Sequence, residues 1–244
     1  MKNTFKLHLG KMFFLYLLGA LCAALAFSAL QIGISAAGSD ETVLYVHAET
    51  GSDEASGSSP DMPLKTLTRA INVLKDTGGR IVIMNAYAVP STVTEPVHTA
   101  PITITSTDGL NDYGLSGAKL TFGNALRYVL NGDTTFENIQ IDFANTLNFV
   151  ANYNHITFGM GVTTNNTSSG NGIYVVGGYQ SPANDVDITK DSHITIQSGS
   201  FYVVVGGTRQ LASGAQNMTF TGTHYIDISG GTIARVYGGS VERQ

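Results

Sequence analysis

Three aspartates stand close together in the last third of the sequence: Asp185, Asp187 and Asp191. Asp185 and Asp187 are two residues apart, so on a β-strand both side chains point to the same side. Carboxylate oxygens are preferred ligands of Ca²⁺, and this group is therefore a candidate calcium site. The spacing does not match an EF-hand loop, because Lys190 stands where that loop requires glycine. A solvated corner loop explains the same residues without a metal, since the polar run 180–184 precedes them.

Tyrosines recur beside Gly-Gly pairs. Tyr174, Tyr202 and Tyr237 come shortly before such a pair, and Tyr179 follows one. An aromatic ring offers a flat amphipathic surface on which a sugar ring can stack. These four tyrosines are therefore candidate glycan ligands if their side chains point outward. The alternative is that they stack on one another and stabilise neighbouring repeats.

Other catalytic signatures are missing from the sequence. The five histidines after residue 37 are isolated from one another, and there is no Gly-x-Ser-x-Gly elbow and no glycine-rich phosphate loop. The only cysteine, Cys22, lies in the N-terminal apolar run, so neither a disulfide nor a thiolate is available after it. The sequence therefore assigns no catalytic residue.

A repeating unit must position these side chains. Residues 225–240 repeat the pattern of residues 193–208 with a shift of 32. Residues 173–178 resemble the last part of each of these two segments. Each copy alternates apolar and polar residues, turns a Gly or Ser corner, continues through a second β-rich run and ends at Gly-Gly. Alternation with period two is typical of a strand with one buried face. A unit of this size can bury that face only by stacking on its neighbours.

Short alternating runs fill residues 85–244, without another clear helix. They begin at intervals of 17 to 21 residues, at Ile102, Leu120, Ile139, Ile156, Ile173 and Ile194. Two all-β architectures fit this pattern: a sandwich or jelly roll of antiparallel hairpins, and a parallel β-helix in which each coil lies on the previous one. The recurrence of similar segments in the same order favours the β-helix, because like side chains then form continuous interior columns.

Residues 38–84 form a different N-terminal unit. A strand is expected at 43–46, a polar loop at 50–60 and a buried β run at 80–84. Between them the sequence predicts a helix, with Thr66 as N-cap and Gly78-Gly79 as its stop. One apolar stripe runs along this helix at positions i, i+3, i+4 and i+7: Leu67, Ala70, Ile71 and Leu74.

The first 37 residues have the features of a secretory signal peptide. Basic residues up to Lys11 precede an apolar run at 12–30, and small residues at 35–37 suit cleavage near Ala37. An uncleaved membrane anchor is the alternative. Cleavage leaves 10 Lys and Arg against 18 Asp and Glu, a net charge of about −8 with scattered basic residues, which argues against nucleic acid as a partner. We expect a secreted or cell-surface protein without membrane insertion after cleavage.

The N-terminal unit carries a recognisable series of short motifs. They are Leu44-Tyr45-Val46, Gly51-Ser52-Asp53, Ser56-Gly57, Pro63-Leu64-Lys65-Thr66-Leu67, Ala70-Ile71 and Gly78-Gly79-Arg80-Ile81-Val82-Ile83. This series resembles the start of secreted right-handed parallel β-helix proteins of the pectate-lyase-like superfamily. The resemblance covers about residues 44–83 and implies an all-β fold, a right-handed parallel β-helix or solenoid with a short N-terminal capping helix. It says little about activity, since the superfamily includes lyases, hydrolases, epimerases and inert surface proteins.

Two functions fit these observations. The first is a bacterial secreted or cell-surface protein without catalysis in this segment, acting as a stalk, an adhesin or a surface that binds a polysaccharide or host glycan. The second is a polysaccharide lyase or glycoside hydrolase that acts on acidic polysaccharide. Lyases of the superfamily hold Ca²⁺ with Asp or Glu, which the group Asp185, Asp187 and Asp191 could provide. Because terminal repeats normally act as caps and none follows the last Gly-Gly corner, we expect the chain to continue beyond Gln244.

Overall fold

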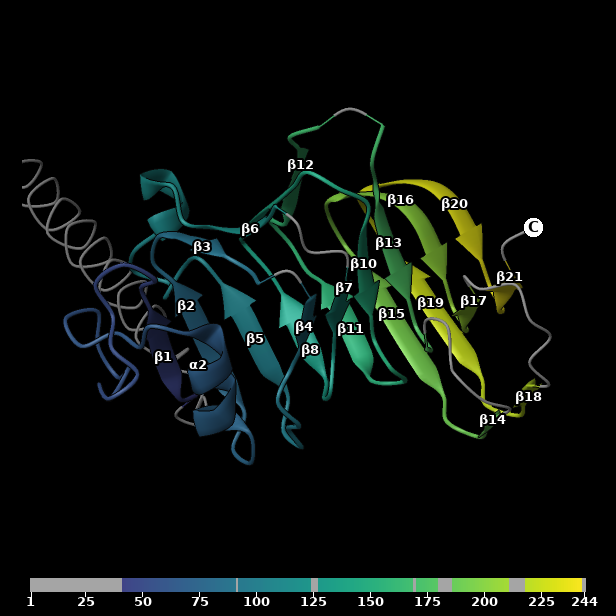
Figure 1. Ribbon diagram of the computed structural model, residues 1–244, viewed down its shortest axis with the longest axis horizontal. Coiled ribbons are helices and arrows are strands. Elements are labelled where there is room, and N and C mark those ends of the chain that lie inside the picture. The colour runs from purple at the N-terminus through teal and green to yellow at the C-terminus, as the bar shows by residue number, and fades with distance from the viewer. Residues whose placement is uncertain are drawn as a thin grey trace, which may run out of the picture. The chain divides into compact units, whose positions relative to one another are not determined.

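The computed structural model describes residues 41–90, 92–123, 127–168, 170–179, 186–210 and 218–242. In this part of the chain the fold is a parallel β-helix, with strands of successive coils side by side in three parallel sheets (Figure 1). The prediction of an all-β solenoid is confirmed, and the sandwich alternative is wrong. All named strand pairs are parallel, and the one antiparallel pairing among the described residues is the isolated bridge between Thr107 and Asp112. The predicted signal peptide, residues 1–37, lies outside the described residues.

Three sheets make up the coils. The seven-stranded sheet contains β1 (Val43–Val46), β2 (Gly79–Ile83), β5 (Ile102–Thr105), β8 (Thr134–Phe136), β11 (His155–Phe158), β15 (Ser192–Ile196) and β19 (His224–Ile228). The six-stranded sheet contains β4 (Thr92–Thr94), β7 (Arg127–Val129), β10 (Leu147–Val150), β13 (Ile173–Val176), β16 (Ser200–Val205) and β20 (Thr232–Tyr237). The four-stranded sheet contains β3 (Ala86–Ala88), β6 (Lys119–Phe122), β9 (Gln140–Phe143) and β12 (Thr163–Asn166). Two further pairs join β14 (Val186–Ile188) to β18 (Met218–Phe220) and β17 (Arg209–Gln210) to β21 (Val241–Glu242).

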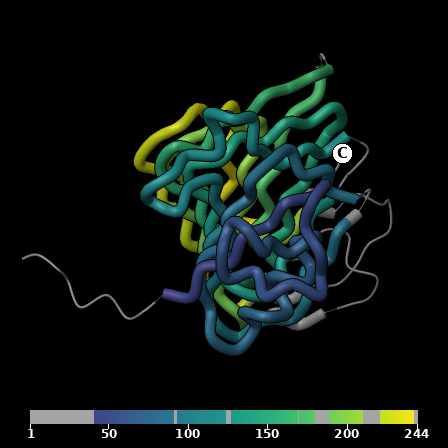
Figure 2. Tube along the Cα trace, turned by 90° about the vertical axis from the view of Figure 1, so that its left-hand side faces the viewer, coloured from purple at the N-terminus to yellow at the C-terminus, as the bar shows by residue number. Residues whose placement is uncertain are grey.

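The four coils from β2 to β13 pass through the seven-stranded, the four-stranded and then the six-stranded sheet. In the last two described coils, β15 is followed by β16 and β19 by β20, without a strand in the four-stranded sheet. Figure 2 shows the turns of the chain from one end. The number of residues between paired positions of neighbouring coils varies. Thr134 and its strand partner Ile156 are 22 residues apart, while Ile156 and its next partner, Ile194, are 38 apart. The runs at intervals of 17 to 21 residues therefore do not mark successive coils, because many are different strands of one coil. The 32-residue repeat does mark a coil, since Ile196 pairs with Ile228.

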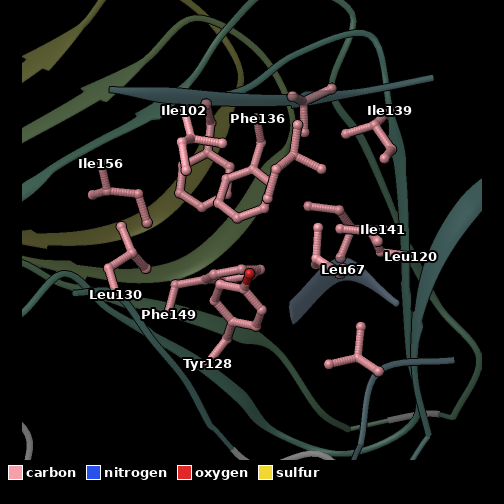
Figure 3. Close-up of a cluster of buried hydrophobic side chains, with 14 of the residues drawn as sticks. Leu67, Ile102, Leu120, Tyr128, Leu130, Phe136, Ile139, Ile141, Phe149 and Ile156 are labelled. Atoms are coloured by element: carbon pink, nitrogen blue, oxygen red, sulfur yellow. The ribbon is translucent and has the colours of Figure 1, made fainter. Parts of the chain in front are cut away.

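Columns of apolar side chains fill the interior. One column in the seven-stranded sheet runs in register through Ile81, Ile104, Phe136, Phe158 and Ile196, all completely buried. Aromatic rings from facing sheets pack against this column, with centroids 5.2–6.0 Å apart (Figure 3). Burying one such side chain contributes about 1.5–3 kcal/mol, so the columns are the main source of stability in a chain without disulfides.

The predicted helix is confirmed as α2 (Leu67–Leu74), with all four residues of its apolar stripe buried. The Thr66 hydroxyl accepts a hydrogen bond from the Arg69 backbone N–H at 3.1 Å, as an N-cap does. The helix ends at Leu74, before the predicted stop at Gly78-Gly79, with Lys75 as its C-cap. Gly78, with φ of 69°, closes the turn that follows, and its N–H bonds to the Leu74 carbonyl. No helix in the described residues is long and apolar enough to span a bilayer. A short 3₁₀ helix, η1 (Tyr113–Ser116), lies in the connection between β5 and β6.

The motif around Asp53 holds the helix start in place. One carboxylate oxygen of Asp53 accepts from the backbone N–H groups of Lys65 and Thr66, at 3.0 and 2.9 Å, and the other accepts from the Thr66 hydroxyl. The same loop also runs beside β1 and covers the edge of that strand. There the Tyr45 N–H donates a hydrogen bond to the Gly57 carbonyl. These motif residues are therefore used to build the fold.

The interior of the last described coil is more exposed to solvent than that of the coil before it. Its core-facing residues Ile228 and Val236 are 42% and 47% exposed, because no described strand stacks beyond β19 and β20. Their equivalents one coil earlier, Ile196 and Val204, are completely buried.

Replacing Asp53 by alanine should lower the free energy of unfolding by about 1–3 kcal/mol, because three hydrogen-bond donors at the helix start lose their acceptor. Urea denaturation followed by circular dichroism measures the change. Glu54→Ala is the matched control, since Glu54 is an exposed neighbour, and it should leave the free energy of unfolding within about 0.5 kcal/mol of wild type. Equal effects of the two substitutions would contradict the role assigned to Asp53.

Candidate functional site

Two of the four predicted tyrosines meet on the outer surface of the six-stranded sheet. Tyr174 in β13 and Tyr202 in β16 have ring centroids 5.5 Å apart and planes at 69°. Their neighbours in sequence, Val175 and Phe201, belong to the buried core, so the alternation along the strands turns the two tyrosines outward. Tyr202 is 40% exposed.

Arginines lie over both rings. The guanidinium carbon of Arg209 is 3.9 Å from the centroid of Tyr174, and that of Arg235 is 5.4 Å from the centroid of Tyr202. Both distances are within the range of cation–π attraction, which contributes about 0.5–2 kcal/mol. Arg209 also donates from Nη1 to Oδ1 of Asn148 at 2.6 Å. Since Arg209 occupies one face of Tyr174, Tyr202 offers the more open ring.

The sheet register extends this group along the coils. Arg127 in β7 pairs with Asn148 in β10, which pairs with Tyr174, and in-register parallel strands place such side chains on one side. We name the surface formed by Arg127, Asn148, Tyr174, Tyr202, Arg209 and Arg235 the Tyr–Arg face. From β7 to β20 it crosses four strand spacings, roughly 19 Å at about 4.8 Å each.

Gly172 leaves the room that Tyr202 needs. A Cβ at residue 172 would lie 2.5 Å from the Cβ of Tyr202, closer than two carbons can approach. Glycine at this corner therefore allows the Tyr202 side chain to lie against the preceding coil.

The other two predicted tyrosines have different surroundings. Tyr237 lies two residues beyond Arg235 in β20, on the same side of the sheet, and is 41% exposed. Tyr179 packs edge-on against Tyr153 at 5.0 Å, and the hydroxyl of Tyr153 bonds to that of Thr208 at 2.9 Å. Tyr179 therefore belongs to the packing of a corner, while the other three tyrosines share the outer surface of one sheet.

The predicted calcium ligands are not brought together within the described residues. Asp185 lies outside them, as does the side chain of Asp187, whose backbone is part of β14. Asp191 is exposed and accepts a hydrogen bond from the Thr223 N–H at 2.7 Å. Among the described side chains, no group of three or more His, Cys, Asp or Glu is arranged to hold a metal ion. The calcium site stays a prediction.

A buried ion pair was not predicted from the sequence. Glu95 Oε2 lies 3.3 Å from His98 Nε2, both side chains are fully buried, and the Thr134 hydroxyl donates to the same oxygen at 3.1 Å. Glu95 Oε1 and the Tyr128 hydroxyl have no hydrogen-bond partner among the described residues. The adjacent cavity of about 10 Å³ has room for about one water molecule. This group therefore stabilises the first coils and is too enclosed to bind a substrate.

A column of rings on the seven-stranded sheet was also missed. His155, His193 and Tyr225 are register partners in β11, β15 and β19. The rings of His193 and Tyr225 stack at 4.5 Å with planes 12° apart, so they turn their faces to each other. Burial and the neighbouring His193 lower the pKa of His155. Such stacking joins the coils and covers one face of the Tyr225 ring.

No known protein family, curated protein or solved structure matches the chain. The three parallel sheets of stacked coils define the class of protein as a parallel β-helix.

His98, which is buried, and His155, which is half-buried, should make stability depend on pH in opposite ways. Burial opposes protonation of His98, but its hydrogen bonds to Glu95 and the Ala100 carbonyl raise its pKa. Its stabilising contribution is therefore complete below about pH 6.5 and is lost as the pH rises through the folded-state pKa. The lowered pKa of His155 gives the reverse: its contribution is present above about pH 6.5 and is lost as the pH falls.

Urea unfolding between about pH 5 and pH 9 tests both directions. The free-energy difference between wild type and His98→Gln should shrink as the pH rises, while His155→Gln should become less destabilising, relative to wild type, as the pH falls. A difference for His98→Gln that does not change with pH would contradict a charged pair with Glu95.

Proposed function

We propose that the protein is a secreted or cell-surface carbohydrate-binding protein that binds a polysaccharide or a cell-surface glycan on the Tyr–Arg face. The observation that carries this proposal is the outward pair of Tyr174 and Tyr202, with the guanidinium groups of Arg209 and Arg235 over their rings. A ring surface and planar hydrogen-bond donors beside it are the two groups that carbohydrate recognition uses.

The chemistry of the two residue types is complementary. The exposed part of Tyr202 fits the apolar C–H side of a sugar ring. Arg235, exposed on the adjacent strand, presents several N–H donors in a fixed plane, which suits hydroxyl or carboxylate oxygens of the same sugar. Arg127 is exposed at the other end of the face. Asn148 lies between the two ends but is 6% exposed and accepts a hydrogen bond from Arg209. A chain of sugars laid along the coils therefore meets Arg127 at one end and Tyr202 and Arg235 at the other.

The sequence of the N-terminal unit supports membership in the pectate-lyase-like superfamily. The Gly-Ser-Asp and Pro-Leu-Lys-Thr motifs that carry the resemblance build the contact between Asp53 and Thr66, which fixes the capping helix. The basic and apolar N-terminal segment and the lack of cysteine after Cys22 support secretion with a fold held by packing alone. A surface protein of this kind can serve as stalk or adhesin while it binds a glycan.

Binding of glycans by the purified protein tests this proposal, first on an array of neutral and acidic oligosaccharides and then by calorimetry with the best ligand. Tyr202→Ala and Arg235→Ala should each weaken binding about tenfold, as the loss of one stacking or guanidinium contact predicts. Tyr225→Ala is the matched control, because Tyr225 is 48% exposed on a different sheet, and its affinity should equal that of wild type.

Two outcomes would contradict the proposal: no glycan binding by a well-folded sample, or Tyr202→Ala with wild-type affinity. Incubation of the same ligands with the protein also tests the enzymatic alternative. Release of unsaturated uronates or new reducing ends would support a lyase or hydrolase in place of a non-catalytic surface.

A further inference from the structure

A second surface feature lies away from the Tyr–Arg face, at the corner between the seven-stranded and four-stranded sheets. Here a pocket of about 220 Å³ is lined by residues of three successive coils. Its walls come from the connection after β5, the corner between β8 and β9, and the corner between β11 and β12. We propose that this pocket binds one neutral sugar unit.

The lining of the pocket is mainly polar. Its two apolar residues, Ala118 and Ile139, are 2% and 1% exposed and add little apolar surface. The walls carry a carboxylate, two amides and two hydroxyls, from Asp112, Asn138, Gln140, Ser106 and Thr163. The hydroxyls of a sugar, which both donate and accept hydrogen bonds, match these groups. A few convergent polar groups are what fixes the orientation of a ligand in a small-molecule site.

The charge of the lining selects against anions. Asp112 is the one charged residue among those that line the pocket, which include no Lys, Arg or His. A uronate or a phosphate would meet the Asp112 carboxylate without a cation to balance it. A neutral sugar can instead donate hydroxyl hydrogen bonds to that carboxylate, and charge-assisted hydrogen bonds are the stronger ones.

Hydrogen bonds between coils hold the walls in place before a ligand arrives. The Ser106 hydroxyl donates to the Asn138 carbonyl at 2.5 Å, and the Asn138 N–H donates to the Met160 carbonyl at 2.8 Å. Asp112 accepts from the Gly114 N–H at 2.9 Å, which fixes its carboxylate at the start of η1. A pocket built in this way loses little conformational entropy on binding.

Glycines keep the space open. A Cβ at Gly114 would lie 2.9 Å from the Asp112 carboxylate and 3.0 Å from the Ser106 hydroxyl. At Gly161, which has φ of 72°, a Cβ would lie 2.2 Å from the Asn138 amide oxygen. Beside these glycines, Leu115 and Met160 are 89% and 67% exposed. They provide apolar surface next to the pocket, on which an adjoining sugar of a longer chain can pack.

Saturation-transfer NMR titrations with D-glucose, D-galactose, D-mannose and N-acetyl-D-glucosamine test the proposal on the intact protein. At least one should bind with a roughly millimolar Kd. Asp112→Ser keeps a side chain that can cap η1 but removes the carboxylate, and Thr163→Val removes one wall hydroxyl at nearly constant shape. Each should raise the Kd about tenfold, as the loss of one hydrogen bond in a polar pocket predicts.

Matched variants separate this site from the Tyr–Arg face. Thr103→Val, on the outer surface of the seven-stranded sheet, and Tyr202→Ala should leave the monosaccharide Kd unchanged. The proposal is overturned if none of the four sugars binds, or if binding is lost in Tyr202→Ala and kept in Asp112→Ser. Glycan binding that depends on Tyr202 is measured in a separate experiment. A negative result for one proposed site therefore does not contradict the proposal for the other.

Discussion

In-register stacking of parallel strands is the constraint on which every other feature depends. A strand that slips by one residue would turn its whole apolar side to solvent. The buried column from Ile81 through Phe136 to Ile196 therefore fixes the register of each coil on the previous one. The length of the corners is free to vary, and it does vary, because partners are separated by as few as 21 and as many as 38 residues. The columns hold the fold while the corners absorb the insertions.

The same register orders the outer surfaces. When inward residues are aligned, the residues between them are aligned as well, so outward side chains also form columns along the coils. One column on the seven-stranded sheet passes through Thr103, Thr135, Thr157 and Thr195, which are half-buried and of one kind. On the six-stranded sheet the column from Arg127 through Asn148 and Tyr174 is of mixed chemistry. Selective recognition needs such a mixture, because uniform columns present the same group at every step.

Local patterns allowed much of the fold to be predicted from the sequence. The stripe and caps of α2 and the alternation of the strands depend on neighbouring residues, and the 32-residue repeat aligned one coil on the next. The intervals between the runs did not reveal which runs belong to one coil, because their period does not distinguish successive coils from successive sheets. The outward tyrosines were found by their place before Gly-Gly corners. Their contacts with Arg209 and Arg235 were not, since these arginines come from later coils at distances that the corners set.

The two proposed sites differ in how they arise from the repeat, and this difference predicts what each can recognise. The Tyr–Arg face is built from neighbouring strands of successive coils, with Val203 in register between Tyr174 and Arg235 and Tyr202 next to Val203 in β16. These strands follow one another at about the strand spacing, which suits a linear polymer laid along the coils. The pocket lies where residues 106–118 leave the repeat through η1, beside the corners that follow β8 and β11. An insertion occurs once, so it creates one group of polar side chains, which suits a single sugar unit. In the two proposals, the regular coils provide the extended surface and the irregular corner provides the site for one unit.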